Sequence, residues 1–415
     1  MILTYSFNYY ENNDRLIELF KISKNLYNQA NYIVRQEFIK NGKYLDYYEM
    51  DKRMKSEVNL EGTINYRLLK SDTAQQCLIS LDKSWKSYFA LIKKFTKDPT
   101  SLKSKPNIPG YKKSNFNYII FTRCTIIKDN IIYLYKNKVK KLTIKIPKFK
   151  DLNFSKCYQE IRIHPTKFNY VKVEIVYKQD TINSDLDVDK FASIDLGIDN
   201  LVTLLTSHNK TIIFNGKPIK SINQLYNKRK AKLCSIKDKM KIKPYTKQLT
   251  LLENERFLSI KDYIHKTTRY IVNYLLQNKI HKLVIGYNKG WKCEVSMGKK
   301  TNQKFVQIPF TMLIHQLQYK CDLVGISIVV TEESYTSKVD SLALEKLGKN
   351  DLYLGIRVKR GLFQSSVGKL INADVNGAMN ILRKVIDDSV AKQIIDRGFC
   401  LNPIKIRNCF SLNSL

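Results

Sequence analysis

Two aspartates of this sequence stand in patterns that suit metal chemistry. Asp195 lies inside the apolar strand pattern FASIDLG, where an ionised carboxylate is costly unless a cation or strong hydrogen-bond donors meet it. Asp374 lies in NADVNGAMNIL, just inside the start of a predicted helix, where the helix dipole favours an anion. A plain helix-start acid is the alternative interpretation of Asp374. A pair of Mg²⁺ ions about 4 Å apart can cleave a phosphodiester when several carboxylates from different elements hold it. A third carboxylate is therefore required.

The charge of the chain indicates a polyanionic partner. Among 415 residues, 72 Lys and Arg face 37 Asp and Glu, which gives a formal net charge of +35. Such a surplus destabilises the compact state unless a polyanion neutralises it, and nucleic acid is the leading candidate. No run of about 18 apolar residues and no signal-peptide pattern is present, so we expect a soluble, intracellular protein with no membrane partner. The eight cysteines contain no C-x-x-C pair, which favours isolated reduced thiols.

The hydrophobic pattern changes twice along the chain, which divides the chain into three regions of predicted secondary structure. Residues 1–10 predict a strand, apolar residues recur at helical spacing within 13–104, and short strand-like runs follow a Pro-containing segment at 105–113. Several short strands at close spacing favour a small barrel, into which the helical block would be inserted. From residue 189 the order of strands, helix and strand is that of an RNase H-like nuclease fold. We therefore predict a multidomain α+β protein.

Six motifs, taken together, resemble the TnpB family of transposon-encoded RNA-guided DNA endonucleases, which are related to Fanzor proteins and type V CRISPR effectors. The motifs are IDLGIDNLVTL, IGYNKGWK, MGKKTNQKFVQIPF, EESYTSK, RVKRGLF and INADVNGAMNIL. The resemblance is strong over residues 191–384 and looser in the N-terminal half. It implies a wedge β-barrel domain (1–12 with 105–188) and a helical recognition insertion (13–104). It also implies a RuvC-like nuclease domain (189–385) and a C-terminal tail (386–415).

The resemblance also implies where the third carboxylate lies. The first and last acidic positions of the family match Asp195 and Asp374, but the middle position, usually Glu, matches Gly286. A branch of the family resembles this sequence in having Gly there and Glu just before the Tyr-Thr-Ser motif, which is Glu333, with Glu332 next in line. In the RNase H-like strand order the Gly286 strand lies between the other two, and a missing Cβ would leave open the space that a Glu side chain there would fill. Adjacent strand residues point to opposite faces, so only one of the two glutamates can reach the site. Both could instead be solvated at a strand end.

Metal and phosphate contacts follow from the same resemblance. It implies Mg²⁺, or Mn²⁺ in its place, held by Asp195, Glu333 and Asp374. Most members carry a four-cysteine zinc ribbon after the Tyr-Thr-Ser motif, but residues 338–353 contain no cysteine, so we predict no zinc. Two basic clusters are candidate phosphate contacts, although each could be a solvated face. They are Lys228, Arg229 and Lys230, and Arg357, Lys359 and Arg360.

The resemblance to the TnpB family implies that the protein is an RNA-guided DNA endonuclease of a transposable element. It would bind a guide RNA and cleave double-stranded target DNA beside a short adjacent motif by two-metal-ion hydrolysis, as a monomeric protein in a ribonucleoprotein. We expect it in the cytoplasm, at the nucleoid in a bacterium, or in a nucleus or viral factory in a eukaryotic host. A nuclease-dead RNA-guided repressor is the alternative if Glu333 cannot reach the metals. A nucleic-acid-binding accessory factor would explain the charge but not the acidic motifs.

Overall fold

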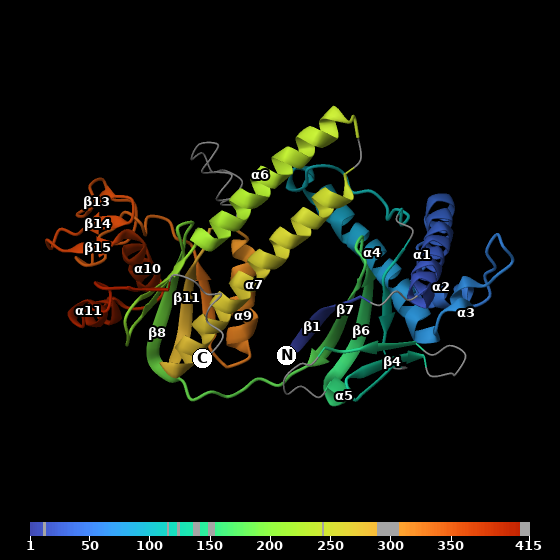
Figure 1. Cartoon of the computed structure of the whole chain (residues 1–415), viewed down its shortest axis with the longest axis horizontal. Helices are drawn as coiled ribbons and strands as arrows, with labels where there is room; N and C mark the ends of the chain where they lie inside the picture. The colour runs from blue at the N-terminus through green and yellow to red at the C-terminus, as the bar shows by residue number, and fades with distance from the viewer. Residues whose placement is uncertain are drawn as a thin grey trace. The chain divides into compact units, whose positions relative to one another are not determined.

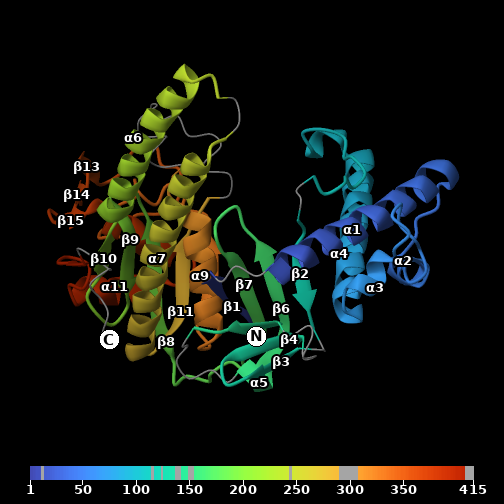
Figure 2. The same cartoon turned by 45° about the vertical axis from the view of Figure 1, so that its right-hand side comes forward.

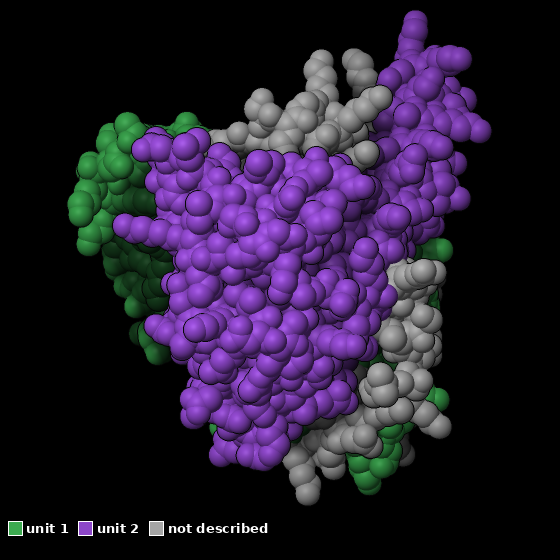
Figure 3. All heavy atoms as spheres, turned by 90° about the vertical axis from the view of Figure 1, so that its left-hand side faces the viewer, with its two compact units in different colours: residues 1–179 green, residues 180–415 purple. Residues whose placement is uncertain are grey.

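The computed structural model divides into two compact units, residues 1–179 and 180–415 (Figures 1 and 3). It describes residues 1–10, 14–113, 116–122, 125–135, 142–147, 154–242, 245–288 and 307–406. Each unit combines helices with sheets around its own buried core, which confirms the multidomain α+β prediction. Residues 289–306 lie outside the described residues. They include the second half of the motif IGYNKGWK and most of the motif MGKKTNQKFVQIPF. Within the described residues, no helix is both long and apolar enough to cross a bilayer.

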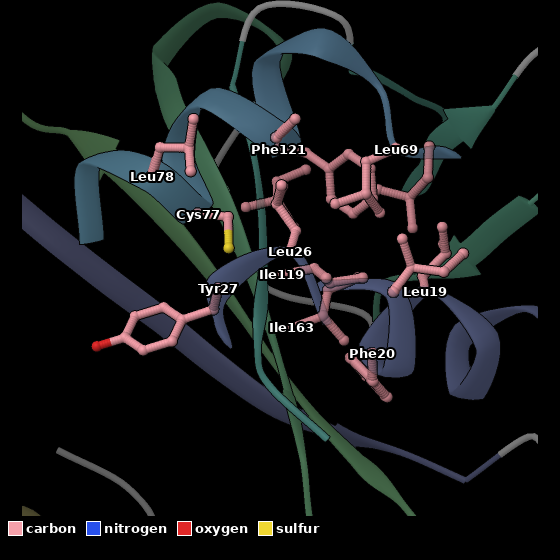
Figure 4. Close-up of a cluster of buried hydrophobic side chains, with 14 of the residues drawn as sticks. Leu19, Phe20, Leu26, Tyr27, Leu69, Cys77, Leu78, Ile119, Phe121 and Ile163 are labelled. Atoms are coloured by element: carbon pink, nitrogen blue, oxygen red, sulfur yellow. The ribbon is translucent and has the colours of Figure 1, made fainter. Parts of the chain in front are cut away.

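The first unit contains a helical block placed in sequence between two strands of one sheet. The helices are α1 (Asp14–Asn41), α2 (Tyr47–Met54), α3 (Asn65–Leu68) and α4 (Ser71–Lys97). Trp85 of α4 is fully buried and donates its indole N–H to Asn31 of α1 (3.1 Å), which joins the two long helices. Further apolar side chains of α1 and α4 pack against strand residues such as Phe121 and Ile163 in the same core (Figure 4).

The strands of the first unit form two sheets that share this core. The four-stranded sheet has the order β1 (Ile2–Tyr9), β7 (Val171–Lys178), β6 (Tyr158–Pro165), β2 (Ile119–Phe121). The three-stranded sheet has the order β3 (Ile126–Lys128), β4 (Ile131–Tyr135), β5 (Leu142–Lys145), and the short helix α5 (Phe154–Cys157) precedes β6. Asp129 and Asn130, which join β3 to β4, have φ of 51° and 57°, as a two-residue hairpin turn requires.

The second unit is built on a six-stranded sheet. Its order is β12 (Ser327–Thr331), β11 (Ile280–Gly286), β8 (Asp187–Leu196), β9 (Asn200–Thr206), β10 (Ile212–Asn215), β16 (Ile404–Ile406). β8, β9 and β10 form an antiparallel meander, whereas β11 pairs in parallel with both β8 and β12. The predicted strand order, with the Gly286 strand between the strands that lead to Asp195 and Glu333, is confirmed.

Helices cover both faces of this sheet. The long antiparallel pair α6 (Lys217–Lys239) and α7 (Lys247–Gln277) precedes α9 (Phe310–Asp322), and α7 and α9 cover one face (Figure 2). Helices α10 (Ala373–Arg383) and α11 (Asp388–Asp396) cover the other face. Alternate strand residues divide between the two cores: Leu283 and Ile285 pack toward α7 and α9, and Val284 packs toward α10.

The remaining elements frame helix α10. The small antiparallel sheet β13 (Ile356–Lys359), β14 (Leu362–Gln364), β15 (Leu370–Asn372) leads directly into it. Part of the segment assigned to the C-terminal tail, 386–415, is folded onto the second unit. It contains α11, whose Ala391 and Ile394 are buried, and β16, which pairs in parallel with β10 at the sheet edge.

Candidate active site

Asp195 is the penultimate residue of β8 and points toward helix α10. Its neighbours Ile194 and Leu196 belong to the core under α7 and α9, so the alternation of the strand turns Asp195 to the opposite face. Ser193, on the same face as Asp195, donates its hydroxyl to the Ala378 carbonyl of α10 (2.6 Å). The pKa of Asp195 is raised well above its usual value, first by burial and then by the negative charges of Asp374 and Glu333. Two further carboxylates therefore lie near enough to Asp195 to disfavour its ionisation.

Asp374 lies in the first turn of α10, where the sequence placed it. The Asn372 side chain caps the helix by accepting the backbone N–H groups of Asp374 (3.0 Å) and Val375 (3.4 Å). Asn200, the first residue of β9, donates its side-chain N–H to the Asp374 carboxylate (2.6 Å). Asn200 was not among the predicted site residues, although it lies within the motif IDLGIDNLVTL. Its amide fixes one carboxylate oxygen of Asp374 and leaves the other for a further ligand.

Gly377, one turn after Asp374, lets α10 approach Asp195 closely. A Cβ at this position would lie 3.2 Å from the Asp195 Oδ2 atom, which is tighter than ordinary van der Waals contact. A larger residue would therefore push the helix away from β8 or turn the carboxylate.

We expect Gly377→Ala to separate activity from stability. Ala is about 1 kcal/mol better than Gly inside a helix, which offsets part of the steric cost. The unfolding temperature should therefore change little, whereas cleavage should fall roughly 10-fold or more because the Asp195 carboxylate is displaced. Gly110→Ala, which adds its Cβ to open space, is the control in both assays. Wild-type cleavage by Gly377→Ala would show that the close approach is unimportant.

Glu333 reaches the same region from beyond β12. Its Oε2 atom lies 3.1 Å from the position of a Cβ on Gly286, so the side chain crosses β11 at the glycine. This oxygen is fully buried and has no hydrogen-bond partner among the described residues. Burial raises the pKa of Glu333 to about 7, and the charge of Lys384 acts in the opposite direction. The space beside Gly286 is not left open as the sequence suggested, because Ile381 of α10 also fills it: a Cβ there would be 2.4 Å from the Ile381 Cδ1 atom.

Glu332 faces away from this site. Its side chain is exposed and accepts the hydroxyl of Ser334, and its carbonyl accepts the ammonium of Lys384 (2.8 Å). β12 ends at Thr331, so both glutamates follow the strand and take opposite directions. The structure thus brings Glu333, and not Glu332, toward Asp195.

The two basic clusters lie on different elements. On α6, Lys228 and Arg229 are exposed, while Lys230 is half-buried against the Tyr226 ring. On the β13–β14 hairpin, Arg357, Lys359 and Arg360 are exposed.

Only the hairpin cluster is coupled to the carboxylates. The charge of Arg357 lowers the pKa of Asp195, opposing the effect of burial. Arg360 forms an ion pair with Asp199 (2.6 Å) in the turn between β8 and β9, and Lys220 pairs with the same carboxylate. The hairpin therefore contributes positive charge that acts on Asp195.

A buried lysine marks the opposite face of the sheet. Lys320 of α9 is 4% exposed and donates to the Thr268 hydroxyl (2.6 Å) and the His265 carbonyl (3.0 Å) of α7. Burial, reinforced by the charge of Arg269, lowers the pKa of Lys320 to about 7. His265 lies here and not among the carboxylates, and burial lowers its pKa to about 4.

We expect Lys320 to make the free energy of unfolding depend on pH above pH 7. Because its pKa is about 7 in the folded state and about 10.4 when unfolded, the unfolded chain binds more protons between these values. The contribution of Lys320 to the free energy of unfolding should thus rise by about 2 kcal/mol from pH 7 to pH 9. Lys320→Met should remove this rise, measured by urea unfolding at both pH values. An equal slope in wild type and variant would contradict the assignment.

Carboxylates also organise the segment where most family members carry cysteines. The fully buried Asp340 accepts backbone and hydroxyl donors of Ser366 (2.7 and 3.0 Å) and the Ser365 hydroxyl (2.8 Å). Glu345 accepts the backbone N–H groups of Asp340 (2.7 Å) and Leu354 (3.1 Å). These hydrogen bonds hold the loop between β12 and β13 together.

We expect this segment to be stable without zinc and sensitive to Asp340. Asp340→Asn should cost about 2–4 kcal/mol, because an amide would leave some of these buried donors unpaired. The exposed Asp351→Asn is the control and should change stability by less than about 0.5 kcal/mol. A strong zinc chelator should leave the unfolding temperature unchanged, and elemental analysis should find no stoichiometric zinc. One tightly held zinc per chain would refute this prediction.

The three carboxylates suit divalent cations as a donor set. Hard oxygen ligands are those that Mg²⁺ prefers, and the unpartnered Glu333 oxygen and the raised pKa of Asp195 both mark an unmet need for positive charge. Across the described residues, however, no three His, Cys, Asp or Glu side chains are gathered closely enough to hold a single ion together.

Comparisons with known proteins agree with this architecture. Residues 174–292 match the OrfB_IS605 family model, described as "Probable transposase", and residues 310–381 match the Cas12f1-like, TNB domain. The "TnpB-like protein ORF457" of Acidianus two-tailed virus is 24% identical over 406 residues, which span 90% of this chain and 83% of that protein. The solved Cas12f1-sgRNA-target DNA complex matches with a TM-score of 0.58 at 15% identity, over 89% of this chain and 83% of that chain, which shows a shared fold.

Proposed function

Since this chain is a member of the TnpB-like family, we propose that it is an RNA-guided DNA endonuclease that cleaves target DNA beside a short adjacent motif. The observation that carries the proposal is the convergence of Asp195, Glu333 and Asp374 from three separate elements, with a buried Glu333 oxygen that has no partner in the described part of the chain. Such a cluster is destabilising by itself, and a cation would offset its cost.

The residues have separate roles in this proposal. Asp195, Glu333 and Asp374 would hold Mg²⁺ or Mn²⁺, which when bound activates a water molecule and stabilises charge on the phosphate. Asn200 orients the Asp374 carboxylate through its 2.6 Å hydrogen bond. Arg357 and Lys359 on the β13–β14 hairpin would attract the phosphates of the DNA strand, and the exposed Lys228 and Arg229 on α6, with Lys230 beside them, would contact guide RNA or target DNA.

The domain assignments and partners extend this proposal. Residues 1–12 with 105–188 would form the wedge domain, 13–104 the recognition block, 189–385 the RuvC-like nuclease domain and 386–415 the tail. The net charge of +35 and the RNA and DNA in the matched Cas12f1 complex support guide RNA and target DNA as partners. The proposal also takes the target DNA to be double-stranded and the protein to be a monomer in the ribonucleoprotein. The protein would work where its target DNA lies: in the cytoplasm of a bacterium, or in a nucleus or viral factory.

A guided DNA-binding protein without nuclease activity is the second candidate. The looseness of the acidic cluster, in which no three described ligands share one ion, is the observation that favours it. It differs from the first candidate in one measurable property, which is cleavage of a bound target.

One experiment decides between the two. The protein would be purified with the RNA of its own locus, the bound RNA sequenced, and the guide segment reprogrammed against a plasmid library with a randomised flank. We expect cleavage of matched plasmids beside a short common motif in Mg²⁺ and none in EDTA. Matched binding without cleavage in Mg²⁺ or Mn²⁺ would support the binder, and absence of any bound RNA would refute both.

A further inference from the structure

Two buried asparagines of helix α10 hold the loop that follows Glu333. Asn380 donates both side-chain hydrogens to main-chain carbonyls of this loop, those of Thr336 (2.9 Å) and Val339 (2.7 Å). Asn376 donates to the same Val339 carbonyl (2.9 Å) and accepts the backbone N–H of Ser341 (3.0 Å). Both asparagines are fully buried, so these contacts are shielded from water.

Residues of this loop are in turn hydrogen-bonded to Glu333. The backbone N–H and the hydroxyl of Thr336 both donate to the Glu333 carbonyl, at 3.2 and 2.8 Å. On its other side, the Glu333 N–H donates to the side chain of Asn288 (2.9 Å), which follows β11. Two hydrogen-bonded steps therefore connect Asn380 of the Asp374 helix with the main chain of Glu333.

The placement of these amides is costly unless they are fully paired. Positions 376 and 380 are four residues apart, so they share one face of α10, and the residues between and around them are apolar and buried. A buried amide without partners costs a few kcal/mol. Here Asn380 is fully used, because its carbonyl oxygen also accepts the guanidinium of Arg383 (2.9 Å). Apolar residues could pack the same surface but could not fix the register of a loop.

We propose that Asn376 and Asn380 are positioning residues for Glu333: they lock the loop after Glu333 to the helix that carries Asp374, so that carboxylates from separate elements keep one geometry toward the metal ions. The proposal rests on the nuclease function proposed above. It assigns the asparagines no contact with metal or DNA. Their effect should therefore appear in metal affinity before it appears in guide-dependent DNA binding.

The test compares Asn380→Ala with a matched buried asparagine of the other unit. Asn31 is also fully buried and donates its side chain to two main-chain carbonyls, those of Pro109 (3.0 Å) and Gly110 (3.1 Å). Asn380→Ala should raise the Mg²⁺ concentration for half-maximal cleavage by roughly 10-fold or more, as loss of a supporting partner of a metal ligand does. Asn31→Ala should lower the unfolding temperature to a similar degree without changing the metal requirement.

A binding measurement makes the result independent of activity. Mn²⁺ binding to the ribonucleoprotein would be titrated, and the sites lost in Asp195→Ala taken as those of the nuclease centre. Asn380→Ala should weaken these sites, and Asn376→Ala should weaken them less, because it acts one step further from Glu333. In a Glu333→Gln background, Asn380→Ala should cause little further loss of cleavage or of Mn²⁺ affinity.

The outcomes separate this inference from the nuclease function. If wild type cleaves but Asn380→Ala and Asn376→Ala both keep its metal requirement and Mn²⁺ affinity, the positioning role is overturned. If both variants lose activity equally at every metal concentration, as a general loss of stability would produce, it is overturned as well. If wild type neither cleaves nor has Mn²⁺ sites that Asp195→Ala removes, the nuclease proposal itself fails. Should Asn380→Ala not fold, Asn376→Ala alone decides between these results.

Discussion

Asp195→Ala and Asp374→Ala should each abolish DNA cleavage while leaving guide-dependent DNA binding nearly unchanged. Each change removes a carboxylate that the nuclease centre needs, and metal ions supply several kcal/mol of transition-state stabilisation. At about 1.4 kcal/mol per tenfold in rate, the loss corresponds to at least ~10³-fold. Binding should survive because neither acid is a phosphate contact. Cleavage would be followed on a matched plasmid, and binding by gel shift with the same ribonucleoprotein.

The stability of these variants provides the internal control. Burial and two neighbouring carboxylates raise the pKa of Asp195, so its ionised form destabilises the metal-free fold. The isosteric Asp195→Asn should therefore unfold at the same or a higher temperature than wild type in EDTA, and still fail to cleave. Cleavage at a near wild-type rate by an Asp195 or Asp374 variant would place the active site elsewhere.

Glu333→Gln should stop cleavage and spare binding, whereas Glu332→Gln should do little to either. Gln keeps the shape of Glu333 but removes the charge from an oxygen that is buried with no partner in the described chain. The Glu332 side chain is exposed and accepts a hydrogen bond from Ser334, so Glu332 is a matched control one residue away. A dead Glu332→Gln variant would shift the assignment by one residue. Two active variants would instead favour the guided DNA-binding protein.

Moving the acid back to its usual place in the family should need a third substitution. Gly286→Glu with Glu333→Ala restores a glutamate to β11, but its Cβ would lie 2.4 Å from the Ile381 Cδ1 atom. We expect this pair to be inactive and Ile381→Ala, added to it, to recover part of the cleavage. Recovery of cleavage without the Ile381 change would mean that α10 can shift to accommodate a side chain at position 286.

The sequence alone determined the features that depend on local pattern and on composition. The apolar alternation around Asp195 identified its strand, the motif around Asp374 identified the start of a helix, and both elements are confirmed. The charge of +35 indicated a polyanionic partner whatever the fold. The two element predictions succeed because strand and helix periods are properties of neighbouring residues, and the net charge follows from the sequence because it is a sum.

Tertiary structure alone decided the features that join distant residues. Strand alternation could not choose between Glu332 and Glu333, because β12 ends at Thr331 and the period of two ends with it. Asn200 is 174 residues from Asp374, and Asn380 is 44 residues from Thr336, so no local pattern relates either pair. Uncharged amides also carry no costly charge that would single them out in an apolar run. Their roles follow from the packing of α10 on the sheet, which only the folded chain establishes.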